Sequence, residues 1–118
     1  MGNIKAALSR NEQDAVTEFK ANLINKVGNY LIEIKLFGSK ATGDSTTYSD
    51  LDLLVILSEV TTDLKDFIYD VAVDMNLKYD VVISPVIYSK HLSQSDYLKD
   101  TCFYKAAVQN GIKIRTKN

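Results

Sequence analysis

The chain has 118 residues, 46% of them apolar and 25% charged, which suits one domain with a buried core and excludes two domains of ordinary size. Fourteen Lys and Arg against fifteen Asp and Glu give a formal charge of −1, which excludes the strongly basic surface of a non-specific nucleic-acid binder. The single cysteine excludes an internal disulfide, and neither a membrane-length apolar run nor a signal-like start is present, so we expect one domain over residues 1–118 in a reducing cytoplasm.

An amphipathic helix is the first predicted element. Ser9, with Glu12 three positions later, matches a capping box and predicts a helix start. Apolar side chains then recur every three or four residues as far as Val27, which indicates one buried stripe. Gly28 is placed to end the helix.

Two strands are expected next. Residues 31–37, LIEIKLF, alternate as a half-covered strand does. Strict alternation predicts one face formed by Ile32, Ile34 and Leu36. Residues 51–57, LDLLVIL, are nearly all apolar and too few for a typical helix, so they predict a central strand.

A helix and a third strand should follow. Residues 61–63, TTD, supply candidate caps for a helix whose apolar positions run from Leu64 to Met75. Residues 80–83, DVVI, predict the third strand. Ser84 and the only proline, Pro85, close this strand, and proline suits a strand end or a sheet edge.

The last part of the chain predicts one more helix and a short strand. The helix is expected over residues 93–110, and IKI at 112–114 follows as a strand. The resulting order of helices and strands indicates an α/β (α+β) fold, with helices packed on a small mixed β-sheet.

The segment from residue 38 to residue 55, GSKATGDSTTYSDLDLLV, carries the candidate chemistry. Asp50 and Asp52 are two apart at the mouth of an apolar strand, so the pleat should point both carboxylates to one face. At about 6 Å and an effective dielectric near 20, their repulsion is about 2–3 kcal/mol, which a bound divalent cation would remove. Hard oxygen ligands without His or Cys favour Mg²⁺ or Mn²⁺ over Zn²⁺, and Mg²⁺ commonly shares substrate phosphates.

Three further residues could complete a metal and phosphate site. Gly38 and Ser39 end the first strand, where glycine permits a sharp turn and a close approach to a ligand. A helix that began at Ser39 would direct free N–H groups at an anion. Asp80 would add a third carboxylate if its strand lies beside the second one. Each feature alone suits an ordinary turn or strand entry, but their combination favours a functional site.

This segment resembles the G-S-x10-D-x-D signature of the minimal nucleotidyltransferases, the smallest members of the DNA polymerase β-like superfamily. In this chain, ten residues separate Gly38-Ser39 from Asp50-x-Asp52. The resemblance covers nearly the whole chain, including KYDVVISPVIYS and the final NGIKI. It implies a nucleotidyltransferase fold, with ATP or another nucleoside triphosphate as donor. It also implies two Mg²⁺ or Mn²⁺ ions held by the catalytic residues Asp50, Asp52 and Asp80, with Gly38 and Ser39 on the triphosphate.

In the mechanism that the resemblance implies, an acceptor hydroxyl attacks the α-phosphorus in line and pyrophosphate leaves. Asp50 and Asp52 would bridge both metals, and Asp80 would hold the metal that activates the nucleophile. Lys40 would neutralise phosphate charge. Many members carry arginines where this chain has Lys40 and Thr42. Thr42 therefore lacks a positive charge, and the Lys40 ammonium cannot form the planar, bidentate hydrogen bonds to phosphate that a guanidinium forms.

The acceptor is expected to come from another molecule, because 118 residues leave no room for the helical acceptor-binding domain of larger relatives. Minimal nucleotidyltransferases often act as antitoxins beside an all-helical HEPN ribonuclease, and transfer AMP to a tyrosine of that toxin. The resemblance therefore implies a HEPN-like helical partner. Two alternatives stay open: a small-molecule or RNA acceptor bound with a helical partner, or a non-catalytic subunit that binds nucleotide or masks a toxin. A homo-oligomer is also open.

Overall fold

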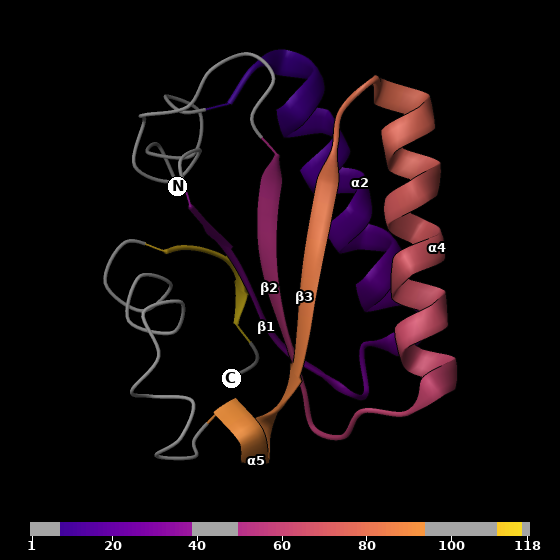
Figure 1. Cartoon of the computed structure of the whole chain (residues 1–118), viewed down its shortest axis with the longest axis vertical. Helices are drawn as coiled ribbons and strands as arrows, with labels where there is room; N and C mark the ends of the chain where they lie inside the picture. Colours follow the sequence, from indigo (N-terminus) through magenta and orange to yellow (C-terminus); the bar gives the residue numbers. More distant parts are fainter. Residues whose placement is uncertain (1–7, 39–49, 94–110, 117–118) are drawn as a thin grey trace.

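A four-stranded sheet with two long helices on one face forms the framework of the chain, as a computed structural model shows (Figure 1). The structure describes residues 8–38, 50–93 and 111–116. In chain order the elements are α2 (Arg10–Val27), β1 (Leu31–Phe37), β2 (Leu51–Leu57), α4 (Thr62–Tyr79), β3 (Ile83–Ser89), α5 (Lys90–Ser93) and β4 (Ile112–Thr116).

The sheet is mixed, as the sequence predicts. Its strand order is β3-β2-β1-β4, with β1 antiparallel to both β2 and β4, and β2 parallel to β3. The apolar strand β2 is internal, while β3 lies at an edge and contains Pro85. An edge position suits proline because the residue has no N–H to donate to a ladder.

Local capping signals predict both long helices correctly. The Glu12 N–H donates to Ser9 Oγ at 3.2 Å, the Ser9 N–H donates to Glu12 Oε1 at 2.9 Å, and α2 ends at Gly28. The N–H of Leu64 donates to Thr61 Oγ1 at 3.1 Å at the start of α4. No helix in the described ranges is both long and apolar enough to cross a membrane.

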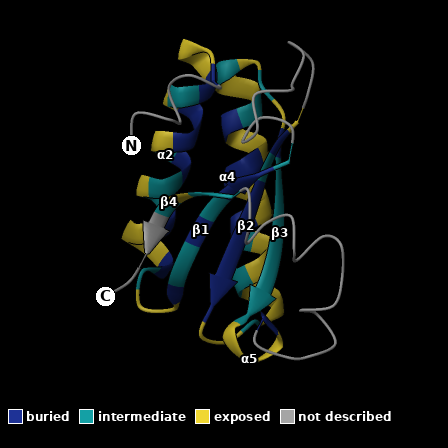
Figure 2. Ribbon diagram, turned by 90° about the vertical axis from the view of Figure 1, so that its left-hand side faces the viewer, coloured by how far each residue is buried: buried dark blue, intermediate teal, exposed yellow. Residues whose placement is uncertain are grey.

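The main core lies between the helices and one face of the sheet. Figure 2 shows buried residues on the inner sides of α2 and α4 and along β1 and β2. Fully buried side chains from all four elements meet there, among them Phe19, Leu23, Leu36, Leu53 and Ile68. A polar bridge also ties the helices together, because Glu18 Oε1 accepts from Lys78 Nζ at 2.8 Å and from the Tyr79 hydroxyl at 2.6 Å.

A bulge corrects the predicted faces of β1. The register with β2 shifts between Leu31 and Glu33. An extra residue in one strand reverses the alternation, so Leu31 joins Ile34 in the helix-covered core. Ile32 packs instead in a smaller cluster with Phe37, Leu54 and Ile56. The prediction that Ile32 shares a face with Ile34 was therefore wrong.

The start of the third strand also differs from the prediction. Helix α4 continues to Tyr79, and Asp80 is its C-cap in the left-handed conformation, with φ 55° and ψ 52°. Strand β3 begins only at Ile83, whose N–H donates to Asn76 Oδ1 at 2.7 Å. Towards the C-terminus, β4 confirms the short final strand, while the helix predicted over residues 93–110 lies outside the described residues apart from Ser93.

Candidate active site

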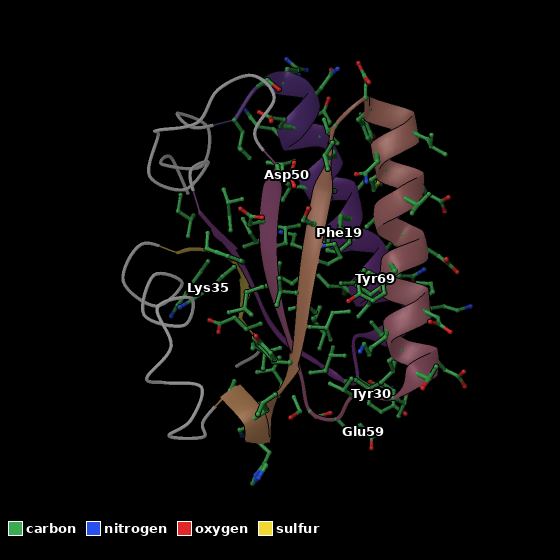
Figure 3. All side chains as sticks on the ribbon, viewed as in Figure 1. Phe19, Tyr30, Lys35, Asp50, Glu59 and Tyr69 are labelled. Atoms are coloured by element: carbon green, nitrogen blue, oxygen red, sulfur yellow. The ribbon has the colours of Figure 1, made fainter. Side chains whose placement is uncertain are left out.

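Asp50 and Asp52 lie at the entrance of β2, on the face of the sheet opposite α2 and α4. Leu51 and Leu53 belong to the core under the helices, so the pleat turns Asp52 to the opposite face. Figure 3 shows Asp50 at the same end of the sheet, where the strand begins. Asp50 accepts a hydrogen bond from Ser84, which is level with Asp52 in the neighbouring strand, so the two carboxylates stand on one face, as their spacing predicts.

The two carboxylates differ in their surroundings. Asp50 is exposed, whereas Asp52 is partly buried. Burial raises the pKa of Asp52, and the negative charge of Asp50 raises it further. Neither carboxylate forms an ion pair with a basic side chain in the described part of the chain. The site therefore holds two acids whose repulsion no described cation offsets.

Gly38 lies against this pair. Its φ of 77° is in the left-handed region, which side chains other than glycine adopt at a cost. A Cβ atom at this position would collide with Oδ2 of Asp52. The positive φ and this close approach to Asp52 both favour glycine at the end of β1, and the predicted corner beside the acids is present. Ser39 and Lys40, predicted to contact phosphate, lie outside the described residues.

Asp80 is not brought together with Asp50 and Asp52. Leu51 is level with Ile83 across the β2–β3 pair, so Asp80 lies in the helix cap before the strand begins. Across residues 8–38, 50–93 and 111–116, no three acidic, histidine or cysteine side chains are close enough to share a metal ion. The predicted strand position of Asp80 was wrong because α4 runs on to Tyr79, and its role as a third ligand stays a prediction.

Ser84 of β3 occupies the position beside the acids instead. It pairs in register with Asp52, and its hydroxyl donates to Oδ2 of Asp50 at 3.1 Å. The sequence predicts Ser84 only as part of a strand end. Its position beside Asp50 follows from the parallel register of β2 and β3, and no local pattern in the sequence specifies that register.

The donor set suits a hard divalent cation. The oxygens of Asp50 and Asp52 face one way, and the described residues place no histidine or cysteine with them. Carboxylate oxygens are the ligands that Mg²⁺ and Mn²⁺ prefer, and Mg²⁺ completes its shell with water and phosphate. The geometry therefore fits a cation shared between two aspartates and a phosphate-bearing ligand.

Comparison with known sequences points to the same chemistry. The family model described as "Nucleotidyltransferase domain" matches residues 16–107. "Putative protein adenylyltransferase MJ0141" of Methanocaldococcus jannaschii is 37% identical over 83 residues, which are 70% of this chain and 84% of that protein. "Putative protein adenylyltransferase MJ0604" of the same organism is 38% identical over 82 residues, 70% of this chain and 78% of its own length.

Solved structures resemble the fold. A mutant form of the toxin-antitoxin MntA-HpeT has a TM-score of 0.59 at 17% identity, covering 87% of this chain and 74% of that chain. A toxin-antitoxin structure with AMP-PNP has a TM-score of 0.56 at 19% identity, covering 86% and 73%. A "putative minimal nucleotidyltransferase" has a TM-score of 0.54 at 20% identity, covering 85% and 92%. At these identities the likeness shows a shared fold.

Proposed function

The chain belongs to the nucleotidyltransferase domain family, and on this premise we propose that it transfers AMP from ATP to a hydroxyl group of a protein. The observation that carries the proposal is the pair Asp50 and Asp52 on the face opposite α2 and α4, with Gly38 pressed against Asp52. Such a pair can hold a cation and the phosphates of a nucleotide side by side. Two M. jannaschii relatives described as protein adenylyltransferases support both the donor and the class of acceptor.

Asp50 and Asp52 are the proposed metal ligands, and the resemblance to the family implies two Mg²⁺ or Mn²⁺ ions. A divalent cation bound there supplies charge neutralisation for the phosphates and a lower pKa for the attacking hydroxyl. Gly38 has no side chain, so its backbone would let a triphosphate come close to Asp52, with Ser39 and Lys40 next along the chain. Asp52, partly buried, must be ionised to bind, so binding should weaken as the pH falls.

The finer proposal names the acceptor as a tyrosine hydroxyl on a helical HEPN-type toxin. This proposal is supported by the sequence resemblance to minimal nucleotidyltransferases and by fold neighbours that are toxin-antitoxin proteins, one of them with AMP-PNP. One of these neighbours is a mutant in which two aspartates two positions apart are both replaced by glutamate, the spacing of Asp50 and Asp52 here. On this proposal the chain inactivates its partner by covalent modification.

The test is transfer of AMP to the protein encoded beside this chain, in the presence of ATP and Mg²⁺. Intact-mass spectrometry should show the partner gaining one or more AMP units with the wild-type chain. Asp50→Asn or Asp52→Asn should reduce the transfer rate by about 10³-fold or more, because the remaining carboxylate holds a cation poorly. Asp70→Asn, at an exposed acid of α4, is the matched control and should keep the wild-type rate.

The same assay separates the possible acceptors and tests the third metal ligand. A partner that stays unmodified at saturating ATP contradicts protein adenylylation, and label transferred from ATP to RNA or to a small molecule would assign another acceptor. Asp80→Asn tests the third ligand: a loss as large as that of Asp52→Asn would support ligation, and a near wild-type rate would exclude it. Each outcome is measured in the same assay with labelled ATP.

A second candidate is a non-catalytic subunit that masks its partner, favoured by Lys40 and Thr42 in place of the family's arginines. The loss of guanidinium groups weakens the planar grip on phosphate. On this hypothesis the double variant Asp50→Asn, Asp52→Asn still binds and neutralises the partner. On the enzymatic hypothesis, neutralisation is lost together with the transfer of AMP.

A further inference from the structure

We infer that Ser84 is a positioning residue of the acidic site, which holds Asp50 beside Asp52 from the neighbouring strand. The inference rests on the proposed function, because it concerns the same two carboxylates. On this inference, the residue that the third strand contributes to the site is Ser84, where the sequence predicted Asp80.

The register of the sheet places Ser84 where it can act. In the parallel pair β2–β3, Asp52 is level with Ser84, so both side chains rise from the same face. A short hydrogen bond supports this register where the two strands begin: the N–H of Leu51 donates to the Val82 carbonyl at 2.7 Å. Ser84 is therefore level with Asp52, and its hydroxyl reaches Oδ2 of Asp50.

The contact itself constrains Asp50. The Ser84 hydroxyl donates to Oδ2 at 3.1 Å, which leaves Oδ1 of the same carboxylate available to a cation. Asp50 is exposed and precedes the first residue of β2, so little else in the described structure restricts its rotamer. A donated hydrogen bond also opposes the repulsion from Asp52. Without it, we expect the two carboxylates to swing apart.

Asp52 is positioned differently. It is partly buried and has Gly38 against its Oδ2. Packing therefore fixes Asp52, while a hydrogen bond from the next strand fixes Asp50. The pair is preorganised only when both restraints are present, and supporting hydrogen bonds of this kind commonly change metal affinity by about 10–100-fold.

The experiment measures binding of Mn²⁺ alone to the whole chain, without nucleotide, by the electron paramagnetic resonance signal of the free ion. Ser84→Ala should weaken Mn²⁺ binding by about 10-fold. Ser84→Thr keeps the hydroxyl and suits a strand, so it should bind within about twofold of wild type. Ser58→Ala, at an exposed serine just after the other end of β2, is the matched control and should not change the affinity.

A second readout separates positioning from folding and from direct catalysis. Thermal unfolding of Ser84→Ala should match that of the wild type. In the transfer assay, this variant should need about 10-fold more Mg²⁺ for half-maximal rate while its rate at saturating Mg²⁺ stays within about threefold. If Ser84 had only a structural role, Ser84→Ala would lower the melting temperature, and the Mg²⁺ concentration needed for half-maximal rate would stay unchanged.

The outcomes distinguish this inference from the proposed function. If the wild type binds Mn²⁺, Asp50→Asn abolishes binding and Ser84→Ala binds normally, the role of Ser84 is overturned and the metal site stands. The role of Ser84 is also overturned if Ser84→Thr fails to restore the affinity that Ser84→Ala loses. If the wild type binds no Mn²⁺ at all, the proposed function and the role of Ser84 fall together.

Discussion

At the scale of single residues, the ionised form of Asp52 is needed for the proposed metal binding but lowers the stability of the fold. Burial and the charge of Asp50 raise the pKa of Asp52 above its ordinary value of 3.8. The folded chain then holds this proton more tightly than the unfolded chain does. Folding stability contributed by Asp52 is therefore greatest below pH 3.8 and falls as the pH rises through the elevated folded pKa. At neutral pH the ionised side chain destabilises the fold.

We predict that Asp52→Asn raises the melting temperature at pH 7 while it abolishes AMP transfer. The amide keeps the shape of the side chain and removes the partly buried charge, so the gain should shrink as the pH is lowered towards 3.8. Differential scanning calorimetry at several pH values measures the difference in melting temperature between Asp52→Asn and the wild type. Asp70→Asn, at an exposed acid of α4, is the matched control and should leave the melting temperature at pH 7 unchanged. A lower melting temperature for Asp52→Asn at pH 7 would contradict this account.

At the scale of elements, the junction between α4 and β3 decides where the site residues stand. The Asn76 carbonyl accepts from the N–H of the left-handed cap residue Asp80, and its side-chain Oδ1 accepts from the N–H of Ile83 at 2.7 Å. One helical residue thus ends α4 and starts β3. Because Ile83 is level with Leu51, the next residue, Ser84, comes level with Asp52.

We predict that Asn76→Ala destabilises the fold by about 1–3 kcal/mol, because it leaves the N–H of a buried residue unpaired. The higher helix propensity of alanine offsets about 0.5 kcal/mol of this loss. Chemical denaturation measures the change. Asn25→Ala makes the same substitution at an exposed position of α2 and should be neutral or slightly stabilising. Equal effects of the two variants would refute the role of Asn76.

Local signals account for the parts of the fold that the sequence predicts correctly. The cap at Ser9 and the alternation around Asp52 depend on neighbours within three or four positions, and both agree with the structure. The bulge after Leu31 and the late start of β3 depend on pairing with distant segments. For the same reason the spacing predicts the acidic pair, while Ser84 emerges only from the register of two strands.

At the scale of the whole molecule, the sheet separates the hydrophobic core from the proposed active site. Helices α2 and α4 cover one face (Figure 1), and Asp52 rises from the opposite face, because its neighbours Leu51 and Leu53 lie in the core. Asp50 lies at the end of the sheet where β2 begins (Figure 3). Along β2 the alternation sends Leu53 into the core and Asp52 to the site, although they are neighbours in sequence. A change on one face should therefore alter stability with little effect on the site, as long as the chain stays folded.

Leu53→Ala is the sharpest test of this separation. The side chain is fully buried, so its truncation should cost about 2–5 kcal/mol and lower the melting temperature by roughly 10 °C or more. Well below that temperature, the folded variant should bind Mn²⁺ within about twofold of wild type, the reverse of the pattern expected for Ser84→Ala. Leu77→Ala, at a leucine that is 81% exposed, is the matched control and should change neither quantity. If Leu53→Ala loses metal binding while fully folded, the two faces are coupled, and the packing under the sheet helps to set the geometry of the acids.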